Sequence, residues 1–210
     1  MRNRTLIHAA NRLQIGTIVG VFAAHLLVPA MASAERRLID TEHSTITVHV
    51  FKSGLFRAFA DNHLIQAPLR DGFLDDGVSP HVQIFVEAQR LRVLDPGLSA
   101  KDREQVQGRM LGPEVLDANR FPEIRFQSAT VQHVEPDGWL VRGELTLHGQ
   151  THVVTLKVLV DQGRYRGSAS LKQTDFGMSP ISVAGGAVKV RDEVKIDFDI
   201  AAGSRTTVIR

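Results

Sequence analysis

The sequence GWLVRGELTLHGQTHVVTLKVLVDQG, residues 138–163, contains the clearest structural signal in the chain. Apolar residues fall at every second position both before and after its central His148-Gly149 pair. A period of two places alternate side chains on opposite faces of an extended strand. The two residues of the pair tolerate the left-handed conformation that a short hairpin requires. The stretch therefore predicts two antiparallel strands joined by a tight turn.

The same period extends outward in both directions. Turn residues at Pro136-Asp137-Gly138 and Asp161-Gln162-Gly163 bound the first hairpin, so residues 123–174 are predicted to form a continuous antiparallel meander. Further alternating runs lie at residues 46–50, 82–86, 124–128 and 194–200. The sequence contains no internal repeat and no linker beyond residue 35, and we therefore expect a single all-β domain.

A long up-and-down sheet has two exposed edges, and closure into a barrel removes them. About eight strands give a barrel whose interior is either filled by side chains or holds one small ligand. The period of the sequence leaves both outcomes open. One stretch breaks the period, because Ser99 can cap a helix that runs to about Leu111 before Gly112-Pro113 ends it. We predict an extended antiparallel β-barrel of about eight strands with a short helical insert.

Residues 1–34 have the organisation of a secretory signal peptide. Three arginines precede any acid, an uncharged run covers residues 13–28, and Ala32-Ser33-Ala34 supplies a small-residue cleavage site. The run is shorter than the ~20 apolar residues that a membrane span requires. We expect cleavage after Ala34, a periplasmic protein, a domain over residues 35–202 and a C-terminal tail at residues 203–210.

Removal of this signal changes the charge of the protein. The whole chain has a net charge of +2 and the signal holds three arginines and no acid, so the mature part is left with −1. No long basic run remains, which argues against a nucleic-acid partner. The chain has no cysteine, which fits an oxidising compartment, and the fold must therefore depend on its core rather than on disulfides.

The sequence contains no nucleophile elbow, no His-Glu-x-x-His and no glycine loop for phosphate or dinucleotide binding. We therefore expect no enzymatic activity. Among candidate metal ligands, His148 and His152 flank a turn but have no evident third partner, which favours two polar residues beside solvent. Asp61 and His63 are two residues apart and would face the same side of a strand, where they could share a metal or a proton. A histidine oriented by an acid for structural reasons is the alternative for the second pair.

Five motifs occur in order along the mature chain. They are Ile39-Asp40-Thr41-Glu42-His43-Ser44, Lys101-Asp102-Arg103, ANRFPEIRF at residues 118–126, GELTLHG at residues 143–149, and TDFGM at residues 174–178 with Asp192-Glu193-Val194. Together they resemble the YceI-like family of lipocalin-like periplasmic proteins. The resemblance covers about residues 38–202.

The resemblance implies a lipocalin-like barrel that binds a polyisoprenoid or similar amphiphilic lipid in an apolar lumen, as a carrier or store, and it implies no catalytic residues. No cofactor is expected other than a bound isoprenoid lipid or quinone. The candidate ligand-binding residues are the apolar ones expected to face inward, for each of which a plain core role is the alternative: Val48, Val50, Ile84, Val86, Met110, Phe126, Leu145, Leu156, Val158, Phe176 and Met178.

Two other functions stay open. A metal- or redox-linked periplasmic protein would use Asp61 and His63, although some relatives carry two histidines in this loop and this chain has Asp61 in place of the first. A scaffold would instead contact a membrane partner such as a quinone or cytochrome complex. Homodimer formation and a transient contact with a membrane or membrane protein are compatible with either function.

Overall fold

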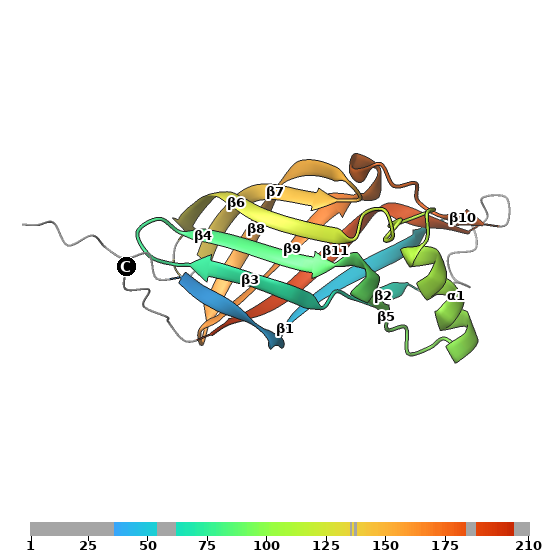
Figure 1. Cartoon of the computed structure of the whole chain (residues 1–210), viewed down its shortest axis with the longest axis horizontal. Coiled ribbons are helices and arrows are strands. Elements are labelled where there is room, and N and C mark those ends of the chain that lie inside the picture. Colours follow the sequence, from blue (N-terminus) through green and yellow to red (C-terminus); the bar gives the residue numbers. More distant parts are fainter. Residues whose placement is uncertain (1–35, 54–61, 135, 137, 184–187, 204–210) are drawn as a thin grey trace, which may run out of the picture. The chain divides into compact units, whose positions relative to one another are not determined.

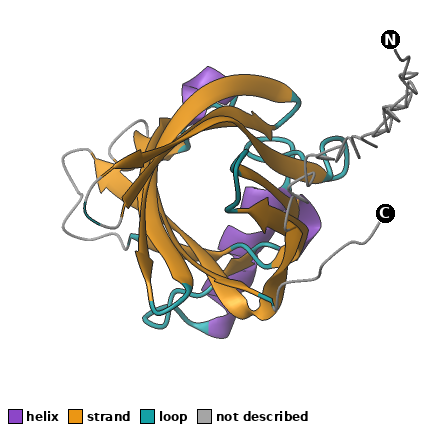
Figure 2. Cartoon of the chain, turned by 90° about the vertical axis from the view of Figure 1, so that its left-hand side faces the viewer, coloured by secondary structure: helices purple, strands orange, loops and turns teal. Residues whose placement is uncertain are grey.

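The computed structural model describes residues 36–53, 62–134, 136, 138–183 and 188–203. Eight strands form a closed antiparallel barrel (Figures 1 and 2), in the order β1, β11, β9, β8, β7, β6, β4, β3 and back to β1. The eight are β1 (Arg36–Ser53), β3 (Leu69–Asp75), β4 (His81–Glu87), β6 (Glu123–Val134), β7 (Gly138–Leu147), β8 (Gln150–Asp161), β9 (Arg164–Lys172) and β11 (Val188–Ala202). The predicted barrel of about eight strands is confirmed.

Smaller elements lie beside this ring. β2 (His63–Gln66) pairs with the second half of β1, β5 (Arg92–Val93) pairs with β2, and β10 (Ser182–Val183) pairs with β11. The helical elements are η2 (Ala88–Arg90), α1 (Ala100–Leu111) and η3 (Gln173–Phe176). Within the described part of the chain, no helix has the length and apolarity needed to cross a membrane.

The helical insert begins and ends where the sequence predicts. The Ser99 side chain accepts a hydrogen bond from the Asp102 backbone N–H at 3.1 Å, which satisfies one of the free donors at the start of α1. Gly112 follows the last helical residue. Met110 is buried against the barrel, so one side of the helix contributes to the core.

The meander from β6 to β9 is regular, because each strand pairs with the next along the chain. Two of its turns have two successive residues with positive φ, His148 and Gly149 in one and Gln162 and Gly163 in the other. This is the backbone of a type I′ turn, whose twist matches that of the flanking strands. The hairpins predicted at these positions are confirmed. The predicted signal peptide at residues 1–34, the turn residue Asp137 and residues 204–210 lie outside the described residues.

The two ends of the barrel differ in what covers them. We call the end that carries η2, α1 and η3 the helix end, on the right in Figure 1. We call the opposite end, which carries the β3–β4 turn at residues 76–80 and the β8–β9 turn at residues 162–163, the hairpin end. The largest buried cluster joins α1 and η3 to the inner faces of the strands and lies at the helix end.

Candidate functional site in the barrel lumen

The inner faces of the strands enclose a cavity of about 280 Å³. Its wall is apolar along most of its length, because every second residue of each strand points inward. β11 is an example, since Val194, Ile196 and Ile200 line the cavity whereas the charged residues between them do not. The lumen of this barrel is therefore a hollow rather than a completely filled core.

Most of the residues predicted to line a lumen do so. The cavity wall includes Val48, Val50, Ile84, Val86, Met110, Phe126, Leu145, Leu156, Val158 and Met178. Phe176 lies elsewhere: only 1% of its surface is exposed, and it packs inside the cluster at the helix end rather than along the cavity. That these residues contact a ligand stays a prediction.

Two glycines help to keep the cavity open. A Cβ atom added at Gly143 would lie 2.7 Å from Cζ of Phe126, and one added at Gly167 would lie 2.6 Å from Cζ of Phe198. Each phenyl ring therefore packs directly over glycine backbone on a neighbouring strand. A side chain at either glycine would push the ring out of this position and toward the lumen.

Apolar side chains close the cavity at the helix end. Met110 of α1, Leu116 and Met178 line it there and are all buried. Gln173 is also part of this wall, and its side-chain Nε2 donates to the backbone carbonyl of Arg191 at 2.8 Å. The amide nitrogen is thus held against the barrel, and the end that meets α1 is predominantly hydrocarbon.

The wall becomes polar at the hairpin end, where Asp75, Asp76, His81 and Tyr165 line the cavity. The Tyr165 O–H donates to Oδ2 of Asp76 at 2.8 Å. Arg37 Nη1 donates to the same carboxylate oxygen at 3.1 Å and to the Tyr165 hydroxyl at 3.2 Å. Burial, together with the hydrogen bond to Asp76, raises the pKa of Tyr165 to about 12, so the phenol is neutral in neutral solution.

This polar end was not anticipated from the sequence. Trp139 also lines the cavity, and extending the alternation of β7 backward from Leu145 would have placed it there. The inward direction of Tyr165 was harder to predict from the sequence. The next two inward positions on β9 are Gly167 and Ala169, and such small residues give no clear apolar alternation. Asp76 lies in a turn, where no periodic pattern indicates the direction of a side chain.

The histidines singled out in the sequence have structural partners. His63 Nδ1 lies 2.6 Å from Oδ2 of Asp95, and the second oxygen of that carboxylate accepts the Leu64 backbone N–H at 2.7 Å. Asp95 is buried, so this contact holds β2 against the segment that precedes α1. Asp61, the other half of the candidate metal pair, lies outside the described residues. Among those that are described, no group of three or more potential ligand side chains is arranged to hold a metal ion.

His148 and His152 contact aromatic rings rather than each other in the interactions that are resolved. Nδ1 of His148 lies 3.0 Å from the Phe176 carbonyl oxygen, and its ring meets Phe121 edge to face. The His152 ring meets the ring of Phe176 in a similar way. These two histidines help to fix the turn between β7 and β8 against η3.

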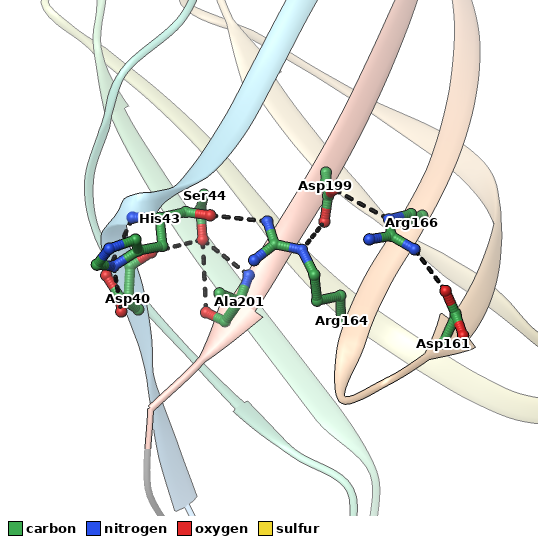
Figure 3. Close-up of polar contacts among 8 residues, drawn as sticks. All are labelled: Asp40, His43, Ser44, Asp161, Arg164, Arg166, Asp199 and Ala201. Carbon is green, nitrogen blue, oxygen red and sulfur yellow. Dashed lines mark hydrogen bonds and ion pairs between the residues drawn. The ribbon is translucent and has the colours of Figure 1, made fainter.

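The opening motif, residues 39–44, forms an irregularity in β1 (Figure 3). The Asp40 carboxylate accepts the backbone N–H groups of Glu42 and His43, and lies 2.9 Å from Nδ1 of His43. Hydrogen bonding from the His43 side chain lowers the pKa of Asp40. Ser44 then bonds across to the Ala201 backbone N–H, so the motif bends β1 and joins it to β11.

The final motif has a similar structural role. Asp192 of β11 accepts hydrogen bonds from both the backbone N–H and the hydroxyl of Thr174 in η3, at 2.9 and 2.7 Å. The hydroxyl hydrogen bond, followed by the backbone one, lowers the pKa of Asp192. The polar residues of these two motifs therefore stabilise joints of the barrel, whereas the motifs at residues 118–126 and 143–149 contribute Phe126 and Leu145 to the lumen wall.

A closed antiparallel barrel with an apolar lumen defines a lipocalin-like protein, and this fold is consistent with a binding function. The YceI-like domain matches residues 38–202, and the chain belongs to this family. A sequence comparison with curated proteins found no match.

Two solved structures illustrate the fold. The crystal structure of BcnA from Burkholderia cenocepacia matches with a TM-score of 0.57 at 18% identity, over 77% of this chain and 98% of that one. A mutant YCEI protein from Campylobacter jejuni matches with a TM-score of 0.50 at 13% identity, over 64% of this chain and 81% of that one. At these identities the likeness concerns the fold.

Proposed function

We propose that this chain is an exported binding protein that holds a polyisoprenoid or similar amphiphilic lipid in the barrel lumen, as a carrier or store and without catalysis. The observation that carries the proposal is the apolar wall that surrounds most of the 280 Å³ cavity. Membership of the YceI-like family supports a binding role. The signal peptide predicted at residues 1–34 is the reason for proposing export to the periplasm.

Burial of hydrocarbon supplies the driving force. Each buried methylene contributes about 0.8 kcal/mol. Ten such groups would contribute about 8 kcal/mol, which corresponds to micromolar affinity before the cost of ordering the chain is subtracted. A ligand must therefore bury most of its tail to bind with useful affinity.

The volume of the cavity limits the length of that tail. Pockets that hold small organic ligands have volumes of roughly 300–1,000 Å³, and the lumen lies at the lower edge of this range with about 280 Å³. A tail of a few isoprene units fits such a space. A longer polyisoprenoid would need the wall side chains to repack, or would extend beyond the barrel.

The first test is native mass spectrometry of the protein purified from its own periplasm, followed by extraction into organic solvent. We expect a prenyl lipid at close to one per chain, on a protein that begins at Glu35. A ligand-free protein of unmodified mass that also fails to take up a defined prenyl alcohol after delipidation would overturn the proposal.

A matched pair of variants separates lumen binding from binding to the outer surface. Val158 lines the cavity and is buried, whereas its neighbour Leu159 faces outward and is 63% exposed. We expect Val158→Trp to fill the lumen and to abolish uptake, and Leu159→Trp to leave uptake unchanged. Equal uptake by both variants would place the lipid outside the barrel.

A further inference from the structure

The two ends of the lumen offer different surroundings to a bound amphiphile. At the helix end the lining residues are apolar side chains and an amide whose nitrogen is bonded to backbone. At the hairpin end the lining residues include Asp76, His81 and Tyr165, which carry a carboxylate, an imidazole and a phenol. An amphiphile buries its tail at low cost among hydrocarbon and keeps its head where polar partners exist. Its head therefore belongs at the hairpin end and its tail toward α1.

The charges at the hairpin end restrict the chemistry of that head. Among the described residues that line the cavity there is no lysine and no arginine, whereas Asp75 and Asp76 are both present, and Oδ1 of Asp75 accepts the Gly77 backbone N–H at 2.8 Å. Arg37 is adjacent, but its guanidinium is bonded to Asp76 and Tyr165 through Nη1 and to the Gly203 carbonyl through Nε. An incoming anion would therefore gain Arg37 as a partner only by disturbing these contacts.

The second arginine at this end is also occupied. Arg36 lies opposite Asp75 in the β1–β3 pairing, and its guanidinium carbon lies 3.8 Å from the centre of the Phe73 ring. Two arginines thus lie close to the two aspartates, Arg37 in an ion pair with Asp76, and the polar end of the lumen has little net charge. Neutral hydrogen-bonding groups fit such a wall, since they need partners but no counter-ion.

We propose that the lumen selects amphiphiles with a neutral polar head, such as a prenyl alcohol or quinone, and discriminates against the phosphorylated form of the same lipid. The proposal rests on the proposed function and adds the class of head group and its position. A phosphate monoester carries about −1.5 to −2 charges at neutral pH. It would have to leave water for a mostly apolar wall beside which Arg37 is already bonded to Asp76 and Tyr165, and this is costly unless a cation is released to pair with it.

The test compares two ligands with the same tail, farnesol and farnesyl phosphate. The chain has one tryptophan, and Trp139 lines the cavity on β7 close to the hairpin end, so its fluorescence reports occupancy directly. With delipidated protein, we expect farnesol to bind at least tenfold more tightly than farnesyl phosphate. Equal or tighter binding of the phosphate overturns the inference, and failure of both ligands to bind overturns the proposed function instead.

Two variants locate the discrimination at the hairpin end. Asp76→Asn releases Arg37 and Asp75→Asn leaves the contacts of Arg37 in place, and each should reduce the preference for the alcohol by threefold or more. The control is Asp197→Asn on the outer wall, where Asp197 pairs with His49 and Lys195, and its preference should equal that of the wild type. A preference that is unchanged in both lumen variants would contradict the assignment.

The position of the head has its own readout. A farnesol analogue that carries bromine beside the hydroxyl should quench Trp139 more strongly than one that carries bromine at the far end of the tail, because quenching by bromine acts at short range. The reverse order would place the head at the helix end and overturn the orientation.

Discussion

The barrel is closed by apolar packing at its helix end and by a polar cluster at its hairpin end. Phe176 and Met178 are 1% and 6% exposed at the helix end. Arg37 and Asp76 at the hairpin end have side chains that are 15% and 24% exposed. A buried apolar side chain contributes several kcal/mol to stability, on the order of 2–5 when it is truncated to alanine, whereas a partly exposed ion pair contributes about 1 kcal/mol or less.

This difference indicates that the end of the barrel that contributes most to folding stability is not the end through which a ligand would enter the lumen. Local opening of a folded protein occurs first where few apolar contacts must be broken. The hairpin end can therefore open at lower cost than the helix end, and it is also where the lumen has its polar lining. The end that holds the barrel together and the end that admits a ligand need not be the same.

The largest effect is expected from truncation at the helix end. Phe176→Ala removes the most deeply buried ring of the core cluster and should lower the free energy of unfolding by about 3–5 kcal/mol. Leu159→Ala serves as the control near the hairpin end, since Leu159 is 63% exposed, and should change stability by less than about 0.5 kcal/mol. Urea denaturation measures both. Comparable losses in the two variants would mean that stability is not concentrated at the helix end.

A loss of stability of intermediate size is expected for a substitution in the barrel wall between the two ends. Gly167→Val would place side-chain atoms against the Lys157 backbone carbonyl and where the Phe198 ring lies, so we expect a loss of about 1–3 kcal/mol or more from overpacking, together with reduced lipid uptake. Gly108→Ala is the control, because a Cβ at this helical position has nothing within 4 Å, and it should gain about 1 kcal/mol from helix propensity. Unchanged stability and uptake in the Gly167 variant would show that the ring can move at no cost.

The sequence predicts the strands and their pairing correctly where neighbouring strands follow one another along the chain. The meander from β6 to β9 could be predicted because alternation and turn residues there determine both the strands and their pairing. The position of β2 could not, because four residues beside the far half of β1 carry no signal of their partner. Closure of the ring between β1 and β11 was expected only from the general cost of exposed sheet edges.

The residues that line the lumen could be predicted from the same alternation, but only in part. Residues such as Val158 and Ile84 follow from alternation, since inward positions of a barrel are apolar. Asp76 and Arg37 come from a turn and from the start of β1, and they meet Tyr165 only in the folded barrel. A contact between residues 37 and 165 is a property of the tertiary structure, so no local pattern could indicate it.

The smallest effect concerns the hairpin end alone and depends on pH. Tyr165 is the only tyrosine in the chain, so tyrosinate absorbance in the near ultraviolet reports on it without interference. Its pKa is about 12 in the folded protein and about 10 in an unfolded chain. In a titration of the folded protein we expect a midpoint well above the one measured in urea. A folded midpoint equal to the value in urea would mean that the phenol is neither buried nor bonded to Asp76 in solution.

The sign of the linked stability change follows from this shift. Below pH ~10 the phenol is neutral in both states, so the stabilising contact with Asp76 is fully present. Between pH ~10 and ~12 the unfolded chain loses the proton more readily than the folded protein does, and stability falls as the pH rises. Tyr165→Phe cannot ionise and should lose less stability than the wild type across this window, as measured by urea denaturation at several pH values. If both proteins lose the same amount, other groups cause the alkaline loss, and the hairpin end is not closed by this phenol.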